Sequence, residues 1–494
     1  MNPAEHLVAL QIVVPLLAAP LVVLLQSRLA WAVASLTSIM AFIIAIAITA
    51  GVLGGVDQQY FMGAWPAPYG IELNVDAFSA VLLLIVTGAS SIALLAAFYS
   101  LDGEVEPERQ PLFFAAWLLA LAGLAGIAVS ADAFNIFVFM EISSLASYVL
   151  VAGGPNRRAL PAVFKYLIMG TIGATFYLIG VGLIYMMTGT LNLADMELRI
   201  HEVADQKPVL VAAGFITVGL ALKAAVFPLH VWLPNAYTYA PHVVTVFLAA
   251  CATKVSLYVL LRFDFFVFQN NLAGHHLQFA YFLMPLAILA ILVASAVAMF
   301  EHNLKRLLAW SSVAQIGYIL LGASLVNLAG LTASILHIFN HAIAKGALFL
   351  AVACLAMHYQ RLRLSDIRGC ARAMPWTMAA FVLAGLSLIG VPGTAGFISK
   401  WYLITAALEM GVAGVAVTAV IIAGSLMAVV YIWRIVEQVY FQPVSDIARM
   451  REAPLGLLLI TWIAALANIY FGFRPELPVT LAEAASLLLV GHIP

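Results

Sequence analysis

The chain has 494 residues, of which 64% are hydrophobic and only 9% are charged. A sequence this apolar cannot cover itself with a water-soluble surface, so a soluble globular protein is excluded and an integral membrane protein is indicated. The formal net charge of −1 gives no basis for a nucleic-acid partner.

Apolar runs long enough to cross a bilayer follow one another along almost the whole chain. About 20 apolar residues span roughly 30 Å of hydrocarbon as a helix, whereas membrane β-strands give alternating segments of about 10 residues. The uninterrupted runs therefore predict an all-α integral membrane protein with about 14 transmembrane helices. The predicted spans are 7–25, 29–51, 75–98, 111–129, 131–152, 161–187, 209–230, 241–264, 278–300, 304–325, 330–357, 375–409, 411–440 and 453–472.

Two of these spans contain helix-breaking residues. Pro228 lies near the end of 209–230, and Pro392 with Gly393 interrupts 375–409, which is too long for one straight helix. Interrupted helices in corresponding places favour internal repeats around central sites, although proline is also simply common in membrane helices. We therefore expect two inverted five-helix repeats, each containing a broken helix. The expected units are an N-terminal three-helix segment (1–110), a first repeat (111–264), a second repeat (278–440), and a C-terminal helix with a short tail (441–494).

Basic residues in the connections predict the orientation of the chain. Thirteen lysines and arginines lie in connections that follow odd-numbered spans, and four lie in the other connections. By the positive-inside rule the odd-numbered connections are cytoplasmic. Both termini are then expected on the outer side of the inner (cytoplasmic) membrane. The segment from Met1 to His6 has no basic region ahead of the first apolar run, so that span is expected to be retained rather than cleaved.

Five ionisable side chains fall inside the apolar runs: Glu141, Lys223, Lys254, Lys345 and Lys400. Placing such a group at bilayer depth costs about 2.5 to 3.5 kcal/mol, so each needs a partner, a hydrated cavity or a task. Together they indicate a path for charge. The alternatives are that Glu141 is half of an ion pair that only locks two helices, and that Lys254 extends its amine to the membrane surface.

A polar stripe is predicted on the span 330–357. His337, His341 and Lys345 are four residues apart, so they share one helix face over about 12 Å. Histidine titrates near neutrality and a desolvated lysine loses its charge readily, so such a stripe can pass protons along. Taken singly, either histidine fits equally well as a side chain that bonds a backbone carbonyl.

Two further histidines, His230 and His242, flank the connection between the seventh and eighth spans, where a proton can enter or leave; a solvated loop histidine is the plainer interpretation. Three scattered cysteines give no disulfide or metal-ligand pattern, and no nucleotide, cofactor or nucleophile motif is present. The sequence predicts neither a metal site nor a catalytic centre.

Several of these motifs match a known family over nearly the whole chain. The matching segments are 134–141, 164–167, Lys223 with 228–234, 305–312, 341–345 and 396–400. The chain resembles the antiporter-like subunits shared by Mrp-type multisubunit cation/proton antiporters, respiratory complex I and membrane-bound hydrogenases. The run 134–152 and the lysine at position 400 are most similar to the D-type subunit of the Mrp antiporters. Val391 departs from the pattern, because many relatives have a second proline there.

The resemblance implies roles for four of the residues. Glu141 would pair with Lys223, Lys254 would relay protons centrally, and Lys400 would connect the relay to one side of the membrane. The implied partners are other membrane subunits of an Mrp-type complex, protons, Na⁺ and the lipid bilayer. A proton-pumping subunit of a complex I-type or hydrogenase redox complex is the alternative from the same family.

The spacings suggest a gate for this transport. With Lys223 beside Glu141 each charge stabilises the other, and separation of the pair favours release of the lysine proton toward Lys254 and the polar stripe. Leaving one buried partner alone costs around 3 to 5 kcal/mol, so the pair is a strong control on proton occupancy. A purely structural membrane subunit remains a further alternative, whereas a solute carrier would need a polar substrate pocket that the sequence does not suggest.

Overall fold

The computed structural model describes residues 6–56, 58–154, 156–268, 275–359, 362–443 and 451–490. Arg361 and Arg449, two of the arginines that set the predicted orientation, lie outside these ranges. The first half of the described chain contains the helices α1 (Leu7–Val23), α2 (Ser27–Leu53), α3 (Ala77–Ser100), α4 (Gln110–Val129), α5 (Ala133–Ala152), α6 (Ala159–Thr188), α7 (Leu193–Val203), α8 (Lys207–Lys223), α9 (Leu233–Tyr239) and α10 (His242–Arg262). The second half contains α11 (His275–Phe300), α12 (Leu304–Ser324), α13 (Leu328–Ala356), α14 (Pro375–Ile389), α15 (Ala395–Leu408), α16 (Val412–Val436), α17 (Leu455–Phe473) and α18 (Glu476–Val490).

The only strands in the described ranges form one small hairpin between α2 and α3. Strand β1 (Gln59–Phe61) pairs antiparallel with β2 (Glu72–Asn74), with Tyr60 opposite Leu73. Single turns of tighter helix cover Met62–Ala64, Leu101–Gly103, Pro107–Arg109 and Cys370–Arg372, and wider π-helical turns extend α10 over Phe263–Val267 and α16 over Glu437–Phe441.

The helices confirm the predicted all-α membrane fold. Within the described residues, eleven helices are long and apolar enough to cross a bilayer, and α1, α14 and α15 are shorter apolar helices. Each predicted span overlaps one helix, except that 375–409 is divided into α14 and α15; the last residues of 209–230 lie in the irregular turn after α8. The total of fourteen spans stays a prediction, because length and composition alone support eleven.

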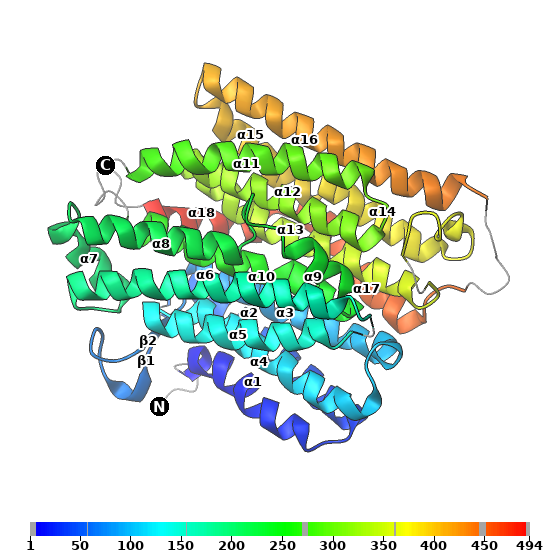
Figure 1. The fold of residues 1–494 in the computed structure, drawn as a ribbon, viewed down its shortest axis with the longest axis horizontal. Helices are drawn as coiled ribbons and strands as arrows, with labels where there is room; N and C mark the ends of the chain where they lie inside the picture. The colour runs from blue at the N-terminus through cyan, green and yellow to red at the C-terminus, as the bar shows by residue number, and fades with distance from the viewer. Residues whose placement is uncertain are drawn as a thin grey trace.

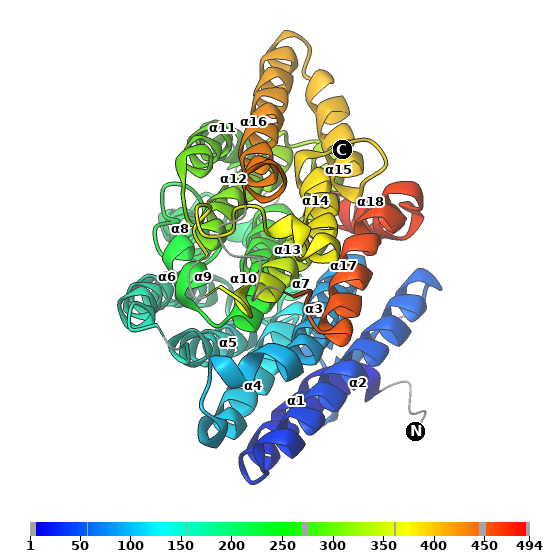
Figure 2. The ribbon, with the colours of Figure 1, turned by 90° about the vertical axis from the view of Figure 1, so that its right-hand side faces the viewer.

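The helices run side by side in one bundle with α13 near its centre (Figure 1, Figure 2). Helix α13 packs against α3, α10, α12, α14, α15, α17 and α18, which explains why nearly all of its residues are buried. The hairpin, α7, α18 and the start of α1 gather at one end of the bundle, which we call the hairpin end (Figure 1). The segment 362–374 lies at the opposite end.

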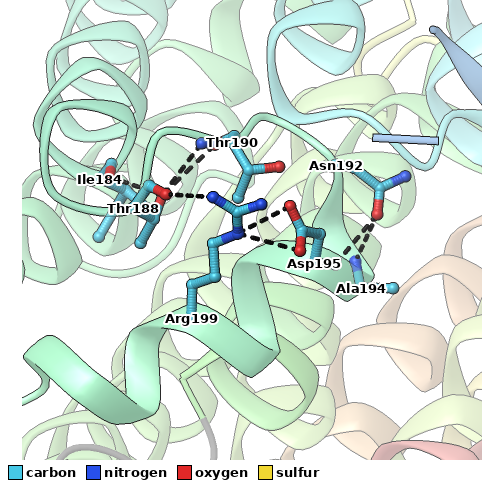
Figure 3. Close-up of polar contacts among 7 residues, drawn as sticks. All are labelled: Ile184, Thr188, Thr190, Asn192, Ala194, Asp195 and Arg199. Carbon is cyan, nitrogen blue, oxygen red and sulfur yellow. Dashed lines mark hydrogen bonds and ion pairs between the residues drawn. The ribbon is translucent and has the colours of Figure 1, made fainter. Parts of the chain in front are cut away.

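Helix α7 was missed by the sequence analysis, which searched for long apolar runs. It is a short amphipathic helix that buries Leu193, Met196 and Ile200. Figure 3 shows how it is held: Arg199 pairs with Asp195 at 3.0 Å and also donates to the carbonyl oxygen of Thr188, at the end of α6, at 3.1 Å. The side chain of Asn192 caps the first turn (Figure 3) and also donates to Glu72 of the hairpin at 2.7 Å. The polar contacts thus join α6, α7 and the hairpin into one surface layer.

Helix α18 occupies a segment that the sequence analysis treated as a short tail. Its 15 residues fell below the length that marks a span. In the structure α18 packs against α3, α13 and the turn 263–267 at the hairpin end.

Both interrupted helices stop beside a lysine. Helix α8 ends at Lys223, and residues 224–232 make an irregular turn before α9, with Ala225 at a φ of 56°. Helix α14 ends before Gly390, whose φ of +91° lies in the region that glycine adopts without strain, and α15 begins at Ala395. Each break leaves backbone carbonyl groups without helical partners at membrane depth.

Candidate functional site

Glu141 and Lys223 lie face to face. The Lys223 amine, on the last residue of α8, is 3.3 Å from Oε1 of Glu141 on α5 and donates to the Ser144 hydroxyl at 2.7 Å. The lysine side chain is 5% exposed and the glutamate 27%. The positive charge also sits at the carboxyl end of a helix, where the peptide dipoles favour it. The Lys223 ammonium is therefore stabilised by the Glu141 carboxylate, the Ser144 hydroxyl and the carboxyl end of α8.

A small cavity adjoins the ion pair. It has a volume of about 30 Å³ and is lined by Lys223, Ser144, Tyr148 and Trp232, and by Ala252 and Ser256 of α10. A polar cavity needs roughly 10 to 15 Å³ to hold a water molecule, so this one has room for water between α8 and α10. The cavity thus extends from the ion pair to the helix that carries Lys254.

Lys254 lies at the middle of α10 and is completely buried. Its amine donates to the carbonyl oxygen of Ala249 on the same helix. The side chain therefore does not extend to the membrane surface, and its burial excludes that interpretation. A buried amine that bonds one backbone carbonyl keeps two further donors available for a mobile partner.

The predicted stripe on α13 is buried along its whole length. Lys345 donates to the carbonyl oxygen of Leu308 on α12 at 2.7 Å. The rings of His337 and His341 are nearly parallel, with centroids 6.2 Å apart. Neither ring nitrogen of His341 has a hydrogen-bond partner among the described residues, although the side chain is buried. Because buried polar groups are nearly always satisfied, His341 is a position where water would complete the hydrogen bonding.

His337 links three helices. Its Nε2 is 2.8 Å from Oε1 of Gln315 on α12, and its Nδ1 is 2.8 Å from the hydroxyl of Ser399 on α15. The amide oxygen only accepts, so Nε2 carries a hydrogen in this arrangement. Ser399 can donate either to Nδ1 or to the carbonyl oxygen of Gly396, 3.3 Å away. The first choice suits a neutral imidazole and the second a protonated one, so the hydroxyl can follow the charge of the ring.

Lys400 follows Ser399 and closes the second helix break. Its amine donates to the carbonyl oxygens of Ile389 at 2.8 Å and Leu388 at 3.2 Å, and to the hydroxyl of Ser425 at 3.0 Å. The same amine lies 4.7 Å above the ring of Tyr318. The carbonyls released at the end of α14 thus bind a lysine, as expected for half-helices around a central cation.

The two histidines near the seventh and eighth spans are not solvated loop residues. His230 is 5% exposed, and its ring stacks on Phe227 and meets Trp310 edge to face. His242 begins α10; its backbone N–H donates to Glu104 at 2.8 Å, and its Nε2 is 3.9 Å from the same carboxylate. Glu104, which follows α3, was not singled out in the sequence.

The structure therefore pairs Glu141 with Lys223 and places most of the other predicted residues on neighbouring helices: α8 packs against α10, α10 against α13, and α13 against α15. Sequence analysis missed the hydroxyl and amide groups that hold these ions: Ser144, Gln315, Tyr318, Ser399 and Ser425. Such side chains occur in many membrane helices, so only their position beside a lysine or histidine marks them. The three cysteines are buried and unpaired.

Comparison with known proteins identifies the family. The model of the NADH:quinone oxidoreductase/Mrp antiporter transmembrane family matches residues 130–432. The chain belongs to this family and is a multi-pass membrane protein.

Three relatives illustrate the range of that family. NADH-quinone oxidoreductase subunit N of Desulforudis audaxviator is 43% identical over 83% of this chain and 81% of its own. The D-type subunit of the Na(+)/H(+) antiporter of Alkalihalophilus pseudofirmus is 28% identical over 84% of this chain and 83% of its own. A chain of the Mrp complex from Dietzia sp. DQ12-45-1b has a similar structure, with a TM-score of 0.89, 27% identity and coverage of 99% of this chain and 98% of that one.

Proposed function

We propose that this protein is a proton-translocating subunit of a multisubunit monovalent cation (Na⁺)/H⁺ antiporter. The observation that carries the proposal is the 3.3 Å ion pair between Glu141 and Lys223, on helices of a bundle whose neighbouring helices α10, α13 and α15 carry the buried side chains Lys254, His337, His341, Lys345 and Lys400. The antiporter relative from Alkalihalophilus pseudofirmus, with a similar sequence over most of the chain, supports the choice of an antiporter. Its protein partners are then other membrane subunits of an Mrp-type complex, the transported ions are protons and Na⁺, and the surrounding medium is the lipid bilayer.

The ion pair acts as the gate of the relay. While Glu141 and Lys223 are paired, the lysine holds its proton; when they separate, the buried ammonium loses its partner and releases a proton toward Lys254 through the adjoining cavity, which has room for water. From Lys254 the proton passes to the stripe of Lys345, His341 and His337. Ser399 then connects His337 with the region of Lys400.

The chain is organised as two inverted repeats, 111–264 and 278–440, with an N-terminal segment, 1–110, and a C-terminal segment, 441–494. Pro228 in one repeat and Pro392 with Gly393 in the other interrupt the helices that present Lys223 and face Lys400. The positive-inside rule places the hairpin end on the outer side of the inner membrane, together with both termini. His242 and Glu104 then lie at the cytoplasmic end and, with His230 in the turn that follows Lys223, offer a route for proton entry or exit.

The test is transport by the intact complex in inverted membrane vesicles. Glu141→Ala and Lys223→Ala are each expected to abolish Na⁺-dependent proton movement while the complex still assembles at normal levels. Lys207→Ala, which removes an exposed lysine at the start of α8, is the control and should transport normally. Normal transport by both pair variants would overturn the proposal, and loss of assembly with no separate loss of transport would indicate a structural subunit.

A second candidate is a proton-pumping subunit of a redox-driven complex. The 43% identity to an NADH-quinone oxidoreductase subunit N favours it. Purification of the native complex separates the two candidates. A redox-driven assembly would copurify with subunits that carry redox centres and would pump on addition of an electron donor, whereas an antiporter would respond to a Na⁺ gradient alone.

A further inference from the structure

A second buried ion pair lies at the hairpin end, apart from the relay. Asp76 caps the first turn of α3 by accepting from the backbone N–H of Ser79 at 2.9 Å. Arg262, the last residue of α10, donates through Nη2 to both oxygens of Asp76, at 2.9 and 2.7 Å. Burial acts to raise the pKa of the Asp76 carboxyl, but Arg262 and the hydrogen bonds from Ser79 outweigh it and hold that pKa below its usual range. The carboxylate is therefore charged and tied to α10.

Asp76 forms part of the wall of an open cleft. The cleft has a volume of about 590 Å³, and Gln58, Asn74 and Asp76 line one part of it, while Ala484 and Leu487 of α18 line another. The Asp76 side chain is 22% exposed and that of Arg262 only 10%. Water in the cleft can thus reach the carboxylate, and the arginine lies behind it.

A hydrogen-bonded chain continues from the pair toward the interior. Arg262 donates to the hydroxyl of Ser79 at 3.3 Å, Ser79 and Tyr258 share a hydrogen bond of 2.9 Å, and Tyr258 lies 3.0 Å from the carbonyl oxygen of Ala128. An arginine only donates and a carbonyl only accepts. The hydrogen of Ser79 is then directed to Tyr258, and that of Tyr258 to Ala128.

Tyr258, the innermost side chain of this hydrogen-bonded series, lies one helical turn from Lys254 along α10. Tyr258 follows Lys254 by four residues on α10, so the two share a face and are separated by about 6 Å of helix rise. Long helical side chains lean toward the preceding turn, so the tyrosine ring leans toward the turn that carries Lys254, while the Lys254 amine itself lies at the carbonyl oxygen of Ala249. The guanidinium carbon of Arg262 packs 4.9 Å from the centre of the same ring.

We propose that Asp76, Ser79 and Tyr258 form the port through which Lys254 exchanges protons with water at the hairpin end, and that Arg262 is its gate. This rests on the proposed function. The present arrangement is closed, because Arg262 donates to Ser79 and an arginine does not release its proton. When Arg262 moves away and the Lys254 side chain turns from Ala249 toward Tyr258, the ammonium gives a proton to the Tyr258 oxygen, the Tyr258 hydrogen passes to Ser79, and the Ser79 hydrogen passes to Asp76 or to water in the cleft. Lys254 becomes neutral, and both hydroxyl groups are restored.

Tyr258→Phe tests the relay in the intact complex. It removes the hydroxyl but keeps the ring that packs on Arg262 and on Phe78, so assembly should be unchanged. Proton transport is expected to fall at least tenfold. Tyr177→Phe is the matched control. Tyr177 is also buried and donates to a backbone carbonyl, that of Ala133 at 2.9 Å, but it does not belong to the hydrogen-bonded series that runs from Asp76 to Tyr258. It should transport within twofold of the unaltered protein, and equal rates for the two variants would overturn the port.

Side-specific measurements distinguish the port from a merely structural cluster. Asp76→Asn keeps a residue that caps a helix well but removes the proton acceptor. It should change the dependence of transport on the pH at the hairpin end and leave the dependence on the opposite pH unaltered. A membrane-impermeant thiol reagent should also label Asn74→Cys from the hairpin end, since the native cysteines are buried. An unlabelled cysteine in the intact complex, or an unchanged pH profile, would contradict the port.

Lys254→Met separates failure of this inference from failure of the proposed function. If Lys254→Met transports normally, the relay itself is wrong. If Lys254→Met is inactive and Tyr258→Phe is normal, the relay stands and only the port is wrong. Loss of transport in both variants, with normal transport by Tyr177→Phe, supports both.

Discussion

The Lys400 amine donates to the carbonyl oxygen of Ile389 across the break between α14 and α15, at 2.8 Å. The lysine thus satisfies a backbone group that the interrupted helix leaves without a partner, and its charge lies at the negative end of a helix dipole. The break and the lysine are therefore one unit, and the consequences of changing either can be predicted.

Lys400→Met should destabilise the protein as well as abolish transport. The substitution keeps the length of the side chain but leaves buried carbonyl oxygens unsatisfied, which costs about 1 to 3 kcal/mol. Thermal unfolding of the purified complex measures this as a lowered Tm. Lys207→Met, at an exposed lysine, is the control and should leave the Tm unchanged. An unchanged Tm for Lys400→Met would show that the amine does not stabilise the break.

Gly390→Ala should weaken the same break from the backbone side. Gly390 has a φ of +91°, and a Cβ there would lie 2.9 Å from Cδ of Lys400. A side chain at this φ costs about 1 to 3 kcal/mol, and the contact would displace the amine. We expect both a lower Tm and slower transport. Gly182→Ala in α6 is the matched control: a Cβ there meets nothing within 4 Å, so this change should be neutral or stabilise by up to about 1 kcal/mol.

A double-mutant cycle on Glu141→Gln and Lys223→Met should reveal energetic coupling. The two side chains are in contact and the lysine is buried, so an interaction of about 0.5 to 3 kcal/mol is expected. The exposed pair of Arg109 and Glu106 is the comparison, and its coupling should not exceed about 1 kcal/mol. Unfolding free energies of the single and double variants supply the measurement. Purely additive effects at Glu141 and Lys223 would mean that their proximity contributes nothing.

Glu104 should give the protein a pH dependence near neutrality. Burial raises the pKa of Glu104 to about 7, against the opposing effects of Lys305 and of the hydrogen bond from His242. The folded state holds the Glu104 proton more tightly than the unfolded state does. The contribution of Glu104 to the free energy of unfolding is therefore fully present below the ordinary pKa of 4.5 and is lost as the pH rises through about 7. Glu104→Gln should remove this component of the Tm profile, and the component of the transport profile centred near pH 7. Glu106→Gln, at an exposed carboxylate, should retain both.

Sequence alone could predict the helical spans and the buried charges, because both depend on the cost of exposing groups to lipid. Long apolar runs locate α2 to α6, and ionisable residues within such runs locate Lys223, Lys254 and Lys345. The same reasoning missed α7 and α18, whose lengths are below a full span. It also counted Arg262 only as one of the four basic residues assigned to the other connections, since nothing in the sequence brings position 76 beside position 262.

The partners of the relay were beyond sequence analysis for a related reason. A serine or glutamine in a membrane helix is common, and its significance depends on the atom it faces. The role of Ser399 follows from its hydroxyl, 2.8 Å from His337, and that of Gln315 from its amide oxygen, which faces the other nitrogen of the same ring. The three-dimensional arrangement, rather than the residue type, identifies these positions.

Helices α3 and α10 are antiparallel neighbours tied together at both extremities. Arg262 binds Asp76 at the start of α3, and His242 binds Glu104 just past its other end. An unbroken helix of 21 residues is a stiff rod about 30 Å long. A stiff helix cannot slide at one end alone. Any axial movement of α10 that separates Arg262 from Asp76 therefore also moves His242 relative to Glu104. The two water-facing ends of the molecule are mechanically linked through α10.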